Sequence, residues 1–175
     1  MEIADAKDLI HDAVIPLEEP LAWADLGCGN GTFTKALAQL LPDGSTLYAV
    51  DKNQQHIIHP DEKKVHIEFI QADFDKEELM LPPLDGILMA NALHYVKGKV
   101  SLLARLQKLL NAEGKFIIVE YDTMRANPWV PYPIDFLHLQ DLLYDAGFRQ
   151  VKKLGERTSI YNRSNMYSCL ARKGN

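Results

Sequence analysis

The chain contains a turn rich in glycine, in which Gly27, Gly29 and Gly31 occupy alternate positions after an acid, Asp25. Glycine has no Cβ, so the backbone can bend sharply at such a turn and approach a bound molecule closely. The residues before the turn form a short apolar run, and those after it have the spacing of a helix, whose first N–H groups lack partners within the helix. The pattern predicts a ligand-binding turn between a buried strand and a helix.

The spacing of these glycines narrows the class of ligand. The dinucleotide-binding fingerprint has its third glycine one position later, where this chain has Thr32. A phosphate-binding P-loop requires a lysine after its glycines, and Gly31 is followed by threonine instead. The turn therefore suits a ligand without a pyrophosphate, and an NAD(P)-dependent oxidoreductase is retained as the alternative function.

Polar side chains at the ends of the next three apolar runs extend the predicted site. Asp51 lies about 20 residues beyond the glycines, where a carboxylate can accept hydrogen bonds from both hydroxyls of a ribose. Asp73 could bind an exocyclic amine and Phe74 could stack on a purine, although Phe74 taken alone fits a core position better. Asn91 follows the fourth run. Because ligands of open α/β sheets bind at the carboxyl ends of the strands, we expect these residues to meet at one edge.

Strand-like and helix-like segments alternate along the chain, which predicts an α/β fold with a mainly parallel sheet and helices on its faces. The predicted helices cover residues 3–15, 33–41, 100–111 and 133–146, and residues 52–63 are expected to hold a helical turn or two at most. The predicted strands cover residues 21–26, 46–50, 65–71, 86–90, 116–120, 148–156 and 165–172. The third strand is expected toward a sheet edge and the fourth and fifth in its middle. The short connection between the last two permits an antiparallel hairpin.

The overall composition argues against several classes of protein. With 175 residues and a formal net charge of −5, the chain is expected to form one domain without a dominant surface for nucleic acids or anionic membranes. It has no apolar stretch of membrane-spanning length and no leader pattern, so a cytoplasmic location is expected. Its two cysteines, Cys28 and Cys169, predict neither a disulfide framework nor a zinc site, and no metal site is expected.

Together these motifs resemble a known family, the class I S-adenosylmethionine-dependent methyltransferases, in particular the small-molecule branch called type 11 or type 25. Residues 25–31, Asp-Leu-Gly-Cys-Gly-Asn-Gly, are similar to the first motif of that family, and Asp51, the Asp73–Phe74 pair and residues 85–96 are similar to the next three. The resemblance covers roughly residues 20–172, with Lys115 after Gly114 as a departure. It implies a Rossmann-like three-layer sandwich with a seven-stranded, mostly parallel sheet whose last strand is antiparallel.

The resemblance also implies the domain organisation and the cofactor. Residues 1–175 would form a single methyltransferase domain, with an N-terminal helix in residues 1–19 and the Rossmann-like core in residues 20–173. The cofactor would be S-adenosylmethionine, leaving S-adenosylhomocysteine as product. Its methionine part would lie at the glycine turn and near Asn91, its ribose at Asp51 and its adenine at Asp73 and Phe74. The expected cofactor-binding residues are Asp25, Gly27, Cys28, Gly29, Gly31, Asp51, Lys52, Asp73, Phe74 and Asn91.

The resemblance to the small-molecule branch implies a small-molecule methyl acceptor. The segment after the fourth predicted strand also lacks the Asn/Asp-Pro-Pro-Tyr/Phe pattern that a resemblance to amino-methyltransferases of nucleic-acid bases would require. Methyl transfer from a sulfonium is an in-line displacement that depends more on positioning than on a fixed catalytic set. His94 could act as a base near neutral pH or could merely line the pocket. The candidate substrate contacts are His94, Tyr95, Tyr121, Trp129, Tyr132 and Arg163.

The loop of residues 121–133, rich in proline and aromatic residues, is expected to form a lid over the acceptor site. We expect the protein to be a monomer or a homodimer, and we expect no nucleic-acid or membrane partner. A non-catalytic cofactor-binding module of the same fold is the third possibility. The acceptor atom does not follow from the sequence.

Overall fold

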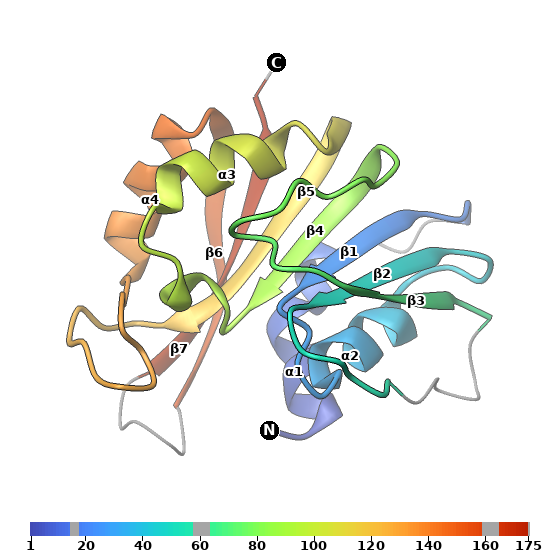
Figure 1. Cartoon of the computed structure of the whole chain (residues 1–175), viewed down its shortest axis with the longest axis horizontal. Coiled ribbons are helices and arrows are strands. Elements are labelled where there is room, and N and C mark those ends of the chain that lie inside the picture. Colours follow the sequence, from blue (N-terminus) through green and yellow to red (C-terminus); the bar gives the residue numbers. More distant parts are fainter. Residues whose placement is uncertain (15–17, 58–63, 159–164, 175) are drawn as a thin grey trace.

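The computed structural model describes residues 1–14, 18–57, 64–158 and 165–174. Within these residues it has a seven-stranded sheet with the strand order β3-β2-β1-β4-β5-β7-β6 (Figure 1). The first five strands pair in parallel, whereas β7 is antiparallel to both of its neighbours, β5 and β6. The strands are β1 (Ala22–Leu26), β2 (Thr46–Asp51), β3 (His66–Gln71), β4 (Leu84–Ala90), β5 (Leu110–Tyr121), β6 (Phe148–Thr158) and β7 (Asn165–Lys173). The predicted fold class is confirmed.

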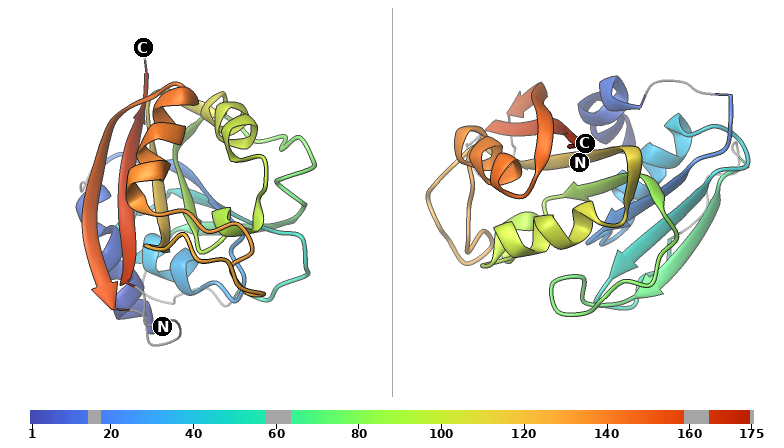
Figure 2. Two further views of the ribbon diagram at one scale, coloured as in Figure 1. Left: turned by 90° about the vertical axis from the view of Figure 1, so that its left-hand side faces the viewer. Right: turned by 90° about the horizontal axis from the view of Figure 1, so that it is seen from above.

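Helices cover both faces of the sheet and complete a three-layer sandwich (Figure 2). One face carries α1 (Ile3–Ile10), continued by the short helix η1 (His11–Ala13), and α2 (Thr32–Leu40); the other carries α3 (Lys99–Gln107) and α4 (Phe136–Asp145). A second short helix, η2 (Leu93–Tyr95), follows β4. In β5, Ile117 packs with the α1–α2 layer and Phe116 and Ile118 with the α3–α4 layer, because successive side chains of a strand point to opposite faces.

The burial of the strands matches their positions in the sheet. In β4 all residues except Asp85 and Ala90 are buried, and β5 is buried from Phe116 to Glu120, as the apolar runs predict for central strands. By contrast, β3 alternates between exposed and half-buried residues and lies at the sheet edge, as expected. Because β3, β2, β1, β4 and β5 are parallel neighbours, their carboxyl ends lie along one edge of the sheet.

Two predicted helices have different bounds in the structure. The last helix begins at Phe136 rather than Pro133, because the carboxylate of Asp135 accepts a hydrogen bond from the N–H of His138 at 2.9 Å and caps it there. The helix before β5 ends at Gln107 rather than residue 111, and Gly114 lies within β5 instead of ending the helix. Residues 52–57 contain no helix, and the rest of the predicted helical turn, residues 58–63, lies outside the described residues.

None of the helices in the described part of the chain is long and apolar enough to cross a membrane.

Candidate functional site

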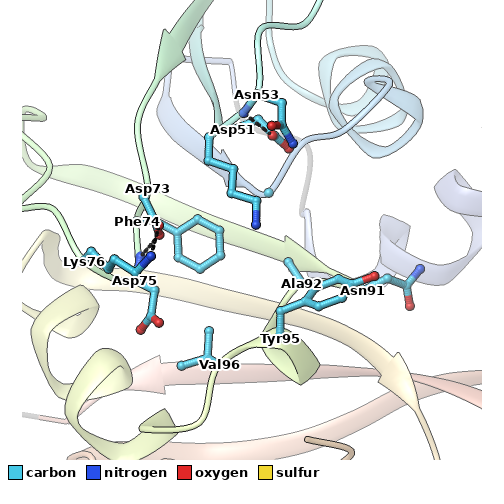
Figure 3. A pocket seen from close by; sticks show the side chains of 12 residues that line it. Asp51, Asn53, Asp73, Phe74, Asp75, Lys76, Asn91, Ala92, Tyr95 and Val96 are labelled. Atoms are coloured by element: carbon cyan, nitrogen blue, oxygen red, sulfur yellow. Dashed lines mark hydrogen bonds and ion pairs between the residues drawn. The ribbon is translucent and has the colours of Figure 1, made fainter. Parts of the chain in front are cut away.

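The carboxyl ends of β1, β2, β3 and β4 surround a cavity of about 570 Å³. Figure 3 shows the side chains that follow β2, β3 and β4 arranged around it. Seven of the residues named from the sequence line this cavity: Gly27, Asp51, Lys52, Asp73, Phe74, Asn91 and Tyr95. The sequence analysis did not propose the other five as binding residues: Asn53, Asp75, Lys76, Ala92 and Val96. The fold therefore brings together polar and aromatic groups from residues that are as far apart as 27 and 96.

The glycine turn packs against the ends of its neighbouring strands. The N–H groups of Gly27 and Cys28 both donate to the carbonyl of Val50, at 2.8 and 3.0 Å. Gly27 has a φ of +78°, and a Cβ at this position would lie 2.6 Å from the Cβ of Ala92. Only glycine satisfies both conditions, so the backbone of the turn forms one wall of the cavity.

Asp51 links the end of β2 to the glycine turn. Its Oδ2 accepts a hydrogen bond from the N–H of Gly29 at 3.0 Å, and its Oδ1 accepts one from the N–H of Asn53 at 2.9 Å. An ionised carboxylate has about four acceptor sites, so about two remain for a ligand. The side chain can therefore hold the turn and bind a pair of hydroxyls simultaneously.

Asp73 and Phe74 follow β3, and the Phe74 ring reaches the glycine turn, because a Cβ at Gly27 would lie 3.4 Å from its Cε1. Asp73 forms an ion pair with Lys76 at 3.2 Å, and its Oδ1 accepts from the N–H of Asp75 at 3.2 Å. Desolvation acts to raise the pKa of Asp73, but the hydrogen bonds from Lys76 and the Asp75 backbone outweigh it, and the pKa is lowered. Asp73 is therefore an anion that helps to shape the loop next to the Phe74 ring.

Asn91 occupies an unusual position at the end of β4. Its φ is +52°, a left-handed conformation that non-glycine residues seldom adopt, and its N–H donates to the carbonyl of Val119 at 2.8 Å. Its Oδ1 is buried and has no hydrogen-bond partner among the residues that the structure describes. Asn91 lines both the main cavity and an adjoining one of about 260 Å³, to which Met1, Cys28 and Gly29 also contribute. An unpaired acceptor between two cavities is the feature expected where a ligand donates a hydrogen bond.

Asp25 and Gly31 support the turn from outside the main cavity. Asp25 is 1% exposed, and its Oδ2 accepts a hydrogen bond from the Thr34 hydroxyl at 2.6 Å. Burial raises the pKa of Asp25 to about 7, against the opposing effect of the Thr34 hydrogen bond. Gly31 is the N-cap residue of α2, with a φ of +79°. Burial, together with the charges of Asp25 and Asp51, raises the pKa of the Cys28 thiol, so this cysteine is not a nucleophile at neutral pH.

The substrate candidates occupy different environments. His94 is buried, and its Nδ1 lies 2.7 Å from Oε2 of Glu120. Tyr95 is 57% exposed and lines the cavity, whereas Trp129 is 74% exposed and does not line it. Tyr121 is half-buried next to His94, with ring centroids 5.9 Å apart.

Tyr132 is partly exposed, and its backbone contacts the segment after β4. Arg163 lies outside the described residues. Arg157, which lies within β6, forms an ion pair with Asp5 of α1, so it helps to hold β6 against that helix.

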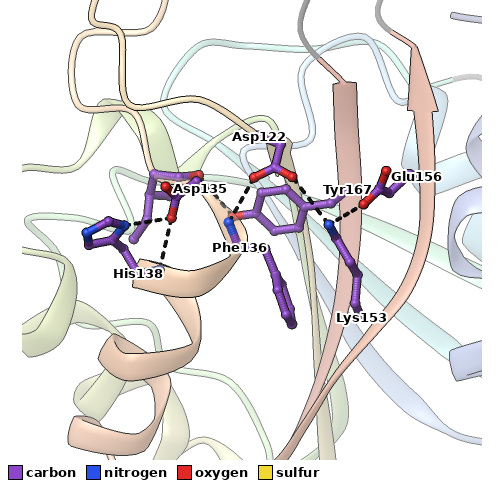
Figure 4. Close-up of polar contacts among 8 residues, drawn as sticks. Asp122, Asp135, Phe136, His138, Lys153, Glu156 and Tyr167 are labelled. Carbon is purple, nitrogen blue, oxygen red and sulfur yellow. Dashed lines mark hydrogen bonds and ion pairs between the residues drawn. The ribbon is translucent and has the colours of Figure 1, made fainter.

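The loop after β5 is held at its base on two sides. Asp122 accepts a hydrogen bond from the N–H of Phe136 at 3.1 Å and pairs with Lys153, which also pairs with Glu156 (Figure 4). The ammonium of Lys99 donates to the carbonyl of Tyr132 at 2.8 Å. That the loop of residues 121–133 forms a lid over an acceptor remains a prediction.

The sequence analysis did not single out Met1, which lines the adjoining cavity, or Glu120, which pairs with His94. Glu120 ends an apolar, β-branched run, as Asp51 and Asn91 end theirs, so the rule that found those two residues could also have found Glu120. Met1 carried no such signal, since its position depends on the packing of α1 against α2.

Comparison with known proteins decides the family. A model of the methyltransferase domain matches residues 24–116, which is more than half of the chain. The chain belongs to the methyltransferase domain family. The predicted family, its Rossmann-like fold and its cofactor, S-adenosylmethionine, are thereby confirmed at the level of the family.

The individual relatives described next are longer proteins than this chain. A trans-aconitate 2-methyltransferase from Acidovorax sp. (strain JS42) is 32% identical over 106 residues, which cover 60% of this chain and 40% of that protein. The chain thus spans less than half the length of this relative. The crystal structure of human N-acetylserotonin methyltransferase in complex with S-adenosylmethionine is 25% identical, with a TM-score of 0.71 over 98% of this chain and 52% of the human chain.

A third relative is similar over more of its own length. The crystal structure of Burkholderia thailandensis 1,6-didemethyltoxoflavin-N1-methyltransferase, with 1,6-didemethyltoxoflavin and S-adenosylhomocysteine bound, has a TM-score of 0.70 at 21% identity. The similarity covers 99% of this chain and 78% of the Burkholderia chain. At this identity the likeness supports the fold of the methyltransferase domain.

Proposed function

We propose that the protein transfers a methyl group from S-adenosylmethionine to a small-molecule acceptor. The backbone of the glycine turn and Asn91 would hold the methionine part of the cofactor, Asp51 the ribose, and Asp73 with Phe74 the adenine end. Lys52, which lines the same cavity, would lie at its rim next to the ribose. Asp25 and Gly31 would act indirectly, by holding the turn and α2 in place.

The main support is the buried Oδ1 of Asn91, which has no hydrogen-bond partner among the described residues and belongs to a residue that lines two adjoining cavities. S-adenosylmethionine carries an ammonium group that can donate to this oxygen, and a ribose whose hydroxyls match the remaining acceptor capacity of Asp51. The aromatic face of Phe74 in the cavity suits a purine. The donor and acceptor groups of the cavity therefore fit the cofactor of the family.

S-adenosylmethionine supplies an electrophilic methyl carbon on a positively charged sulfur, so the protein needs only to orient two reactants and exclude water. The glycine turn and the end of β4 would hold the first reactant, the cofactor. Tyr95, which is exposed at the cavity, and the loop of residues 121–133 would border the other reactant. The loop contributes Trp129 and Tyr132 as exposed aromatic groups that could cover a flat acceptor.

A small-molecule acceptor is favoured by the names of two relatives, which are methyltransferases of trans-aconitate and of 1,6-didemethyltoxoflavin. The negative net charge of the chain also disfavours an extended nucleic-acid surface. The identity of the acceptor differs between these relatives, so the proposal is limited to a small molecule.

Titration calorimetry with S-adenosylhomocysteine, and with NADH as the competing cofactor, tests the first part of the proposal. We expect saturable binding of S-adenosylhomocysteine and none of NADH; the reverse result would favour an oxidoreductase. Turnover is then measured with radiolabelled S-adenosylmethionine against a panel of small acceptors. Binding without turnover of any acceptor would indicate a non-catalytic module.

A further inference from the structure

Arg105, in the last turn of α3, holds the segment that follows β3. Its Nη2 donates two hydrogen bonds, one to the carbonyl of Phe74 and one to the carbonyl of Asp75 at 2.9 Å. In the part of the chain that the structure describes, no backbone N–H donates to either of these carbonyls. The guanidinium therefore satisfies two consecutive carbonyls that the turn itself leaves without a backbone partner.

The guanidinium extends from a helix that is packed firmly into the core. Leu102, Leu103 and Leu106 of α3 are buried against the sheet, on the face that also carries α4. Arg105 itself is half-buried and does not line the cofactor cavity. It can therefore influence a ligand of that cavity only through the residues that it holds.

One of the two hydrogen bonds is connected to the cavity through a single peptide unit. The carbonyl of Phe74 and the N–H of Asp75 belong to the same peptide bond, which is planar and directs these two groups to opposite sides. Arg105 holds the carbonyl, and the N–H donates to Oδ1 of Asp73 at 3.2 Å. Arg105 therefore sets the direction of the Asp75 N–H and, through it, the orientation of the Asp73 carboxylate.

The other contacts of Asp73 hold its main chain or restrain its carboxylate only weakly. Its backbone N–H donates to Oε1 of Glu77 at 2.8 Å, and its carbonyl accepts from the N–H of Glu77 at 2.8 Å. Its Oδ2 pairs with Lys76 at 3.2 Å, but the Lys76 side chain is 79% exposed, and an ion pair at the surface is a weak restraint. The hydrogen bond from the Asp75 N–H is thus the contact that orients the carboxylate.

The proposed adenine site depends on this segment. Asp73 and Phe74 line the cavity next to each other (Figure 3), and a Cβ at Gly27 would lie 3.4 Å from Cε1 of the Phe74 ring. A carboxylate accepts a hydrogen bond from an exocyclic amine only when one of its free acceptor sites is directed at that amine. The orientation of the Asp73 carboxylate therefore decides whether the cavity distinguishes a purine with an exocyclic amine from one without it.

We infer that Arg105 is a positioning residue for base recognition: it sets the selectivity of the cofactor site for the exocyclic amine of adenine without contacting the cofactor. This inference rests on the proposed function and adds to it a residue that determines specificity for the base. The simpler explanation is that Arg105 only holds α3 against the segment after β3 and contributes to stability. Base selectivity separates the two, because a loss of stability alone changes the affinity for both kinds of purine by the same factor.

The test compares two ligands by titration calorimetry: S-adenosylhomocysteine, and its analogue in which hydrogen replaces the exocyclic amine. We expect the wild type to bind S-adenosylhomocysteine about 10- to 100-fold more tightly than the analogue, as is typical of a hydrogen bond to a charged group. Arg105→Met removes the donors but keeps an unbranched apolar side chain, and it should reduce this preference to about threefold or less. Its affinity for the analogue should change little, since the analogue has no amine for Asp73 to accept from.

Lys108→Met is the matched control, because Lys108 is an exposed cation at the C-cap of the same helix. Both substitutions remove a positive charge from the C-terminus of α3, where it interacts favourably with the helix dipole. Lys108→Met should keep the wild-type preference, and Arg105→Lys, which keeps a cation without the planar guanidinium, should have an intermediate one. In Asp73→Ala the preference should already be lost, and adding Arg105→Met should lower it no further.

Melting temperatures show first that each variant folds; if Arg105→Met does not, Arg105→Gln is judged by the same ratio of affinities. Two results would overturn the inference while leaving the proposed function intact. One is a folded Arg105→Met protein that keeps the wild-type preference for the amine; the other is a wild type that binds both ligands equally well. Failure of the wild type to bind S-adenosylhomocysteine would instead refute the proposed function.

Discussion

The carboxylate of Asp51 accepts a hydrogen bond from the N–H of Gly29 at 3.0 Å, so the end of β2 holds the glycine turn that follows β1. The turn also hydrogen-bonds to the carbonyl of Val50, the residue before Asp51. A residue that is proposed to bind the ribose is therefore also part of the support of the proposed methionine-binding turn. The two parts of the cofactor site are coupled through one side chain.

Asp51→Ala should weaken the binding of S-adenosylhomocysteine by about 10- to 100-fold, the equivalent of about 1.5–3 kcal/mol for hydrogen bonds to a charged group. Asp51→Asn keeps one acceptor oxygen and should lose less. Calorimetry gives the affinities, and the melting temperature without ligand shows how much of the effect comes from the turn. Glu68→Ala, on the exposed side of the edge strand β3, is the control and should change neither value. An unchanged affinity in Asp51→Ala would contradict the ribose assignment.

The contact between Gly27 and Ala92 can be tested by a double-mutant cycle. A Cβ at Gly27 would lie 2.6 Å from the Ala92 Cβ, so Gly27→Ala should lower the free energy of unfolding by both this clash and the strain of a φ of +78°. Ala92→Gly removes the opposing methyl group, so in the double mutant it should recover the part of the stability that Gly27→Ala lost to the clash. The two substitutions should therefore show a favourable coupling energy of about 1 kcal/mol or more in urea unfolding. Gly29→Ala is matched for strain, because its φ is +50° and nothing lies within 4 Å of its Cβ position. If the effects of Gly27→Ala and Ala92→Gly on the free energy of unfolding were additive, the glycine turn would not lie close to the residues that follow β4.

The buried carboxyl of Asp25 should make stability depend on pH in a defined window. Burial raises its pKa from 3.8 to about 7 in the folded protein, so between these values the folded state binds a proton that the unfolded state has released. The wild type should therefore lose stability relative to Asp25→Asn as the pH rises from about 4 to about 7, by at most about 1.4 kcal/mol per pH unit. Above that window the difference should become constant.

Urea unfolding of both proteins at several pH values measures this difference. An asparagine can still accept the Thr34 hydrogen bond, so packing is conserved in the comparison. Asp141→Asn, at an exposed position of α4, serves as control and should show no such window. A difference between the wild type and Asp25→Asn that does not change with pH would show that Asp25 is ionised in the folded protein.

The sequence was sufficient to predict the sheet and most of the cavity for a geometric reason. Apolar runs identify buried strands, and in a parallel sheet the residues that follow each strand meet at one edge, so Asp51, Asp73 and Asn91 could be placed together without coordinates. Asp25 was also predicted to bind the cofactor, but its side chain does not line the cavity. It belongs to the glycine motif, yet it faces Thr34 of α2, since the strand's alternation directs it away from the cavity.

Contacts between distant segments were beyond such reasoning. The pairing of His94 with Glu120 depends on the register that places Ala90 of β4 next to Val119 of β5, and a single strand does not reveal its register. The first residue of α4 could not be predicted either, because Pro133 and Asp135 each favour a different start for the helix. Pro133 fits a first helical turn, but Asp135 caps the helix and Asp122 accepts the N–H of Phe136, and these two bonds decide the outcome.

Asn91 combines backbone strain with an unpaired acceptor, which predicts opposite effects on stability and binding. Asn91→Gly removes the strain of a φ of +52° and the buried, unpartnered Oδ1, so the free energy of unfolding should be unchanged or higher by about 1 kcal/mol. Affinity for S-adenosylhomocysteine should nevertheless fall by about 5- to 20-fold, because the proposed hydrogen bond is lost. Asn91→Ala is the matched variant: it should lose the same affinity but be less stable than Asn91→Gly, since its Cβ keeps the strain. Urea unfolding and calorimetry on the three proteins separate the two effects. An Asn91→Gly protein that binds as tightly as the wild type would mean that the unpaired oxygen does not contact the cofactor, and the position of the methionine end would have to be revised.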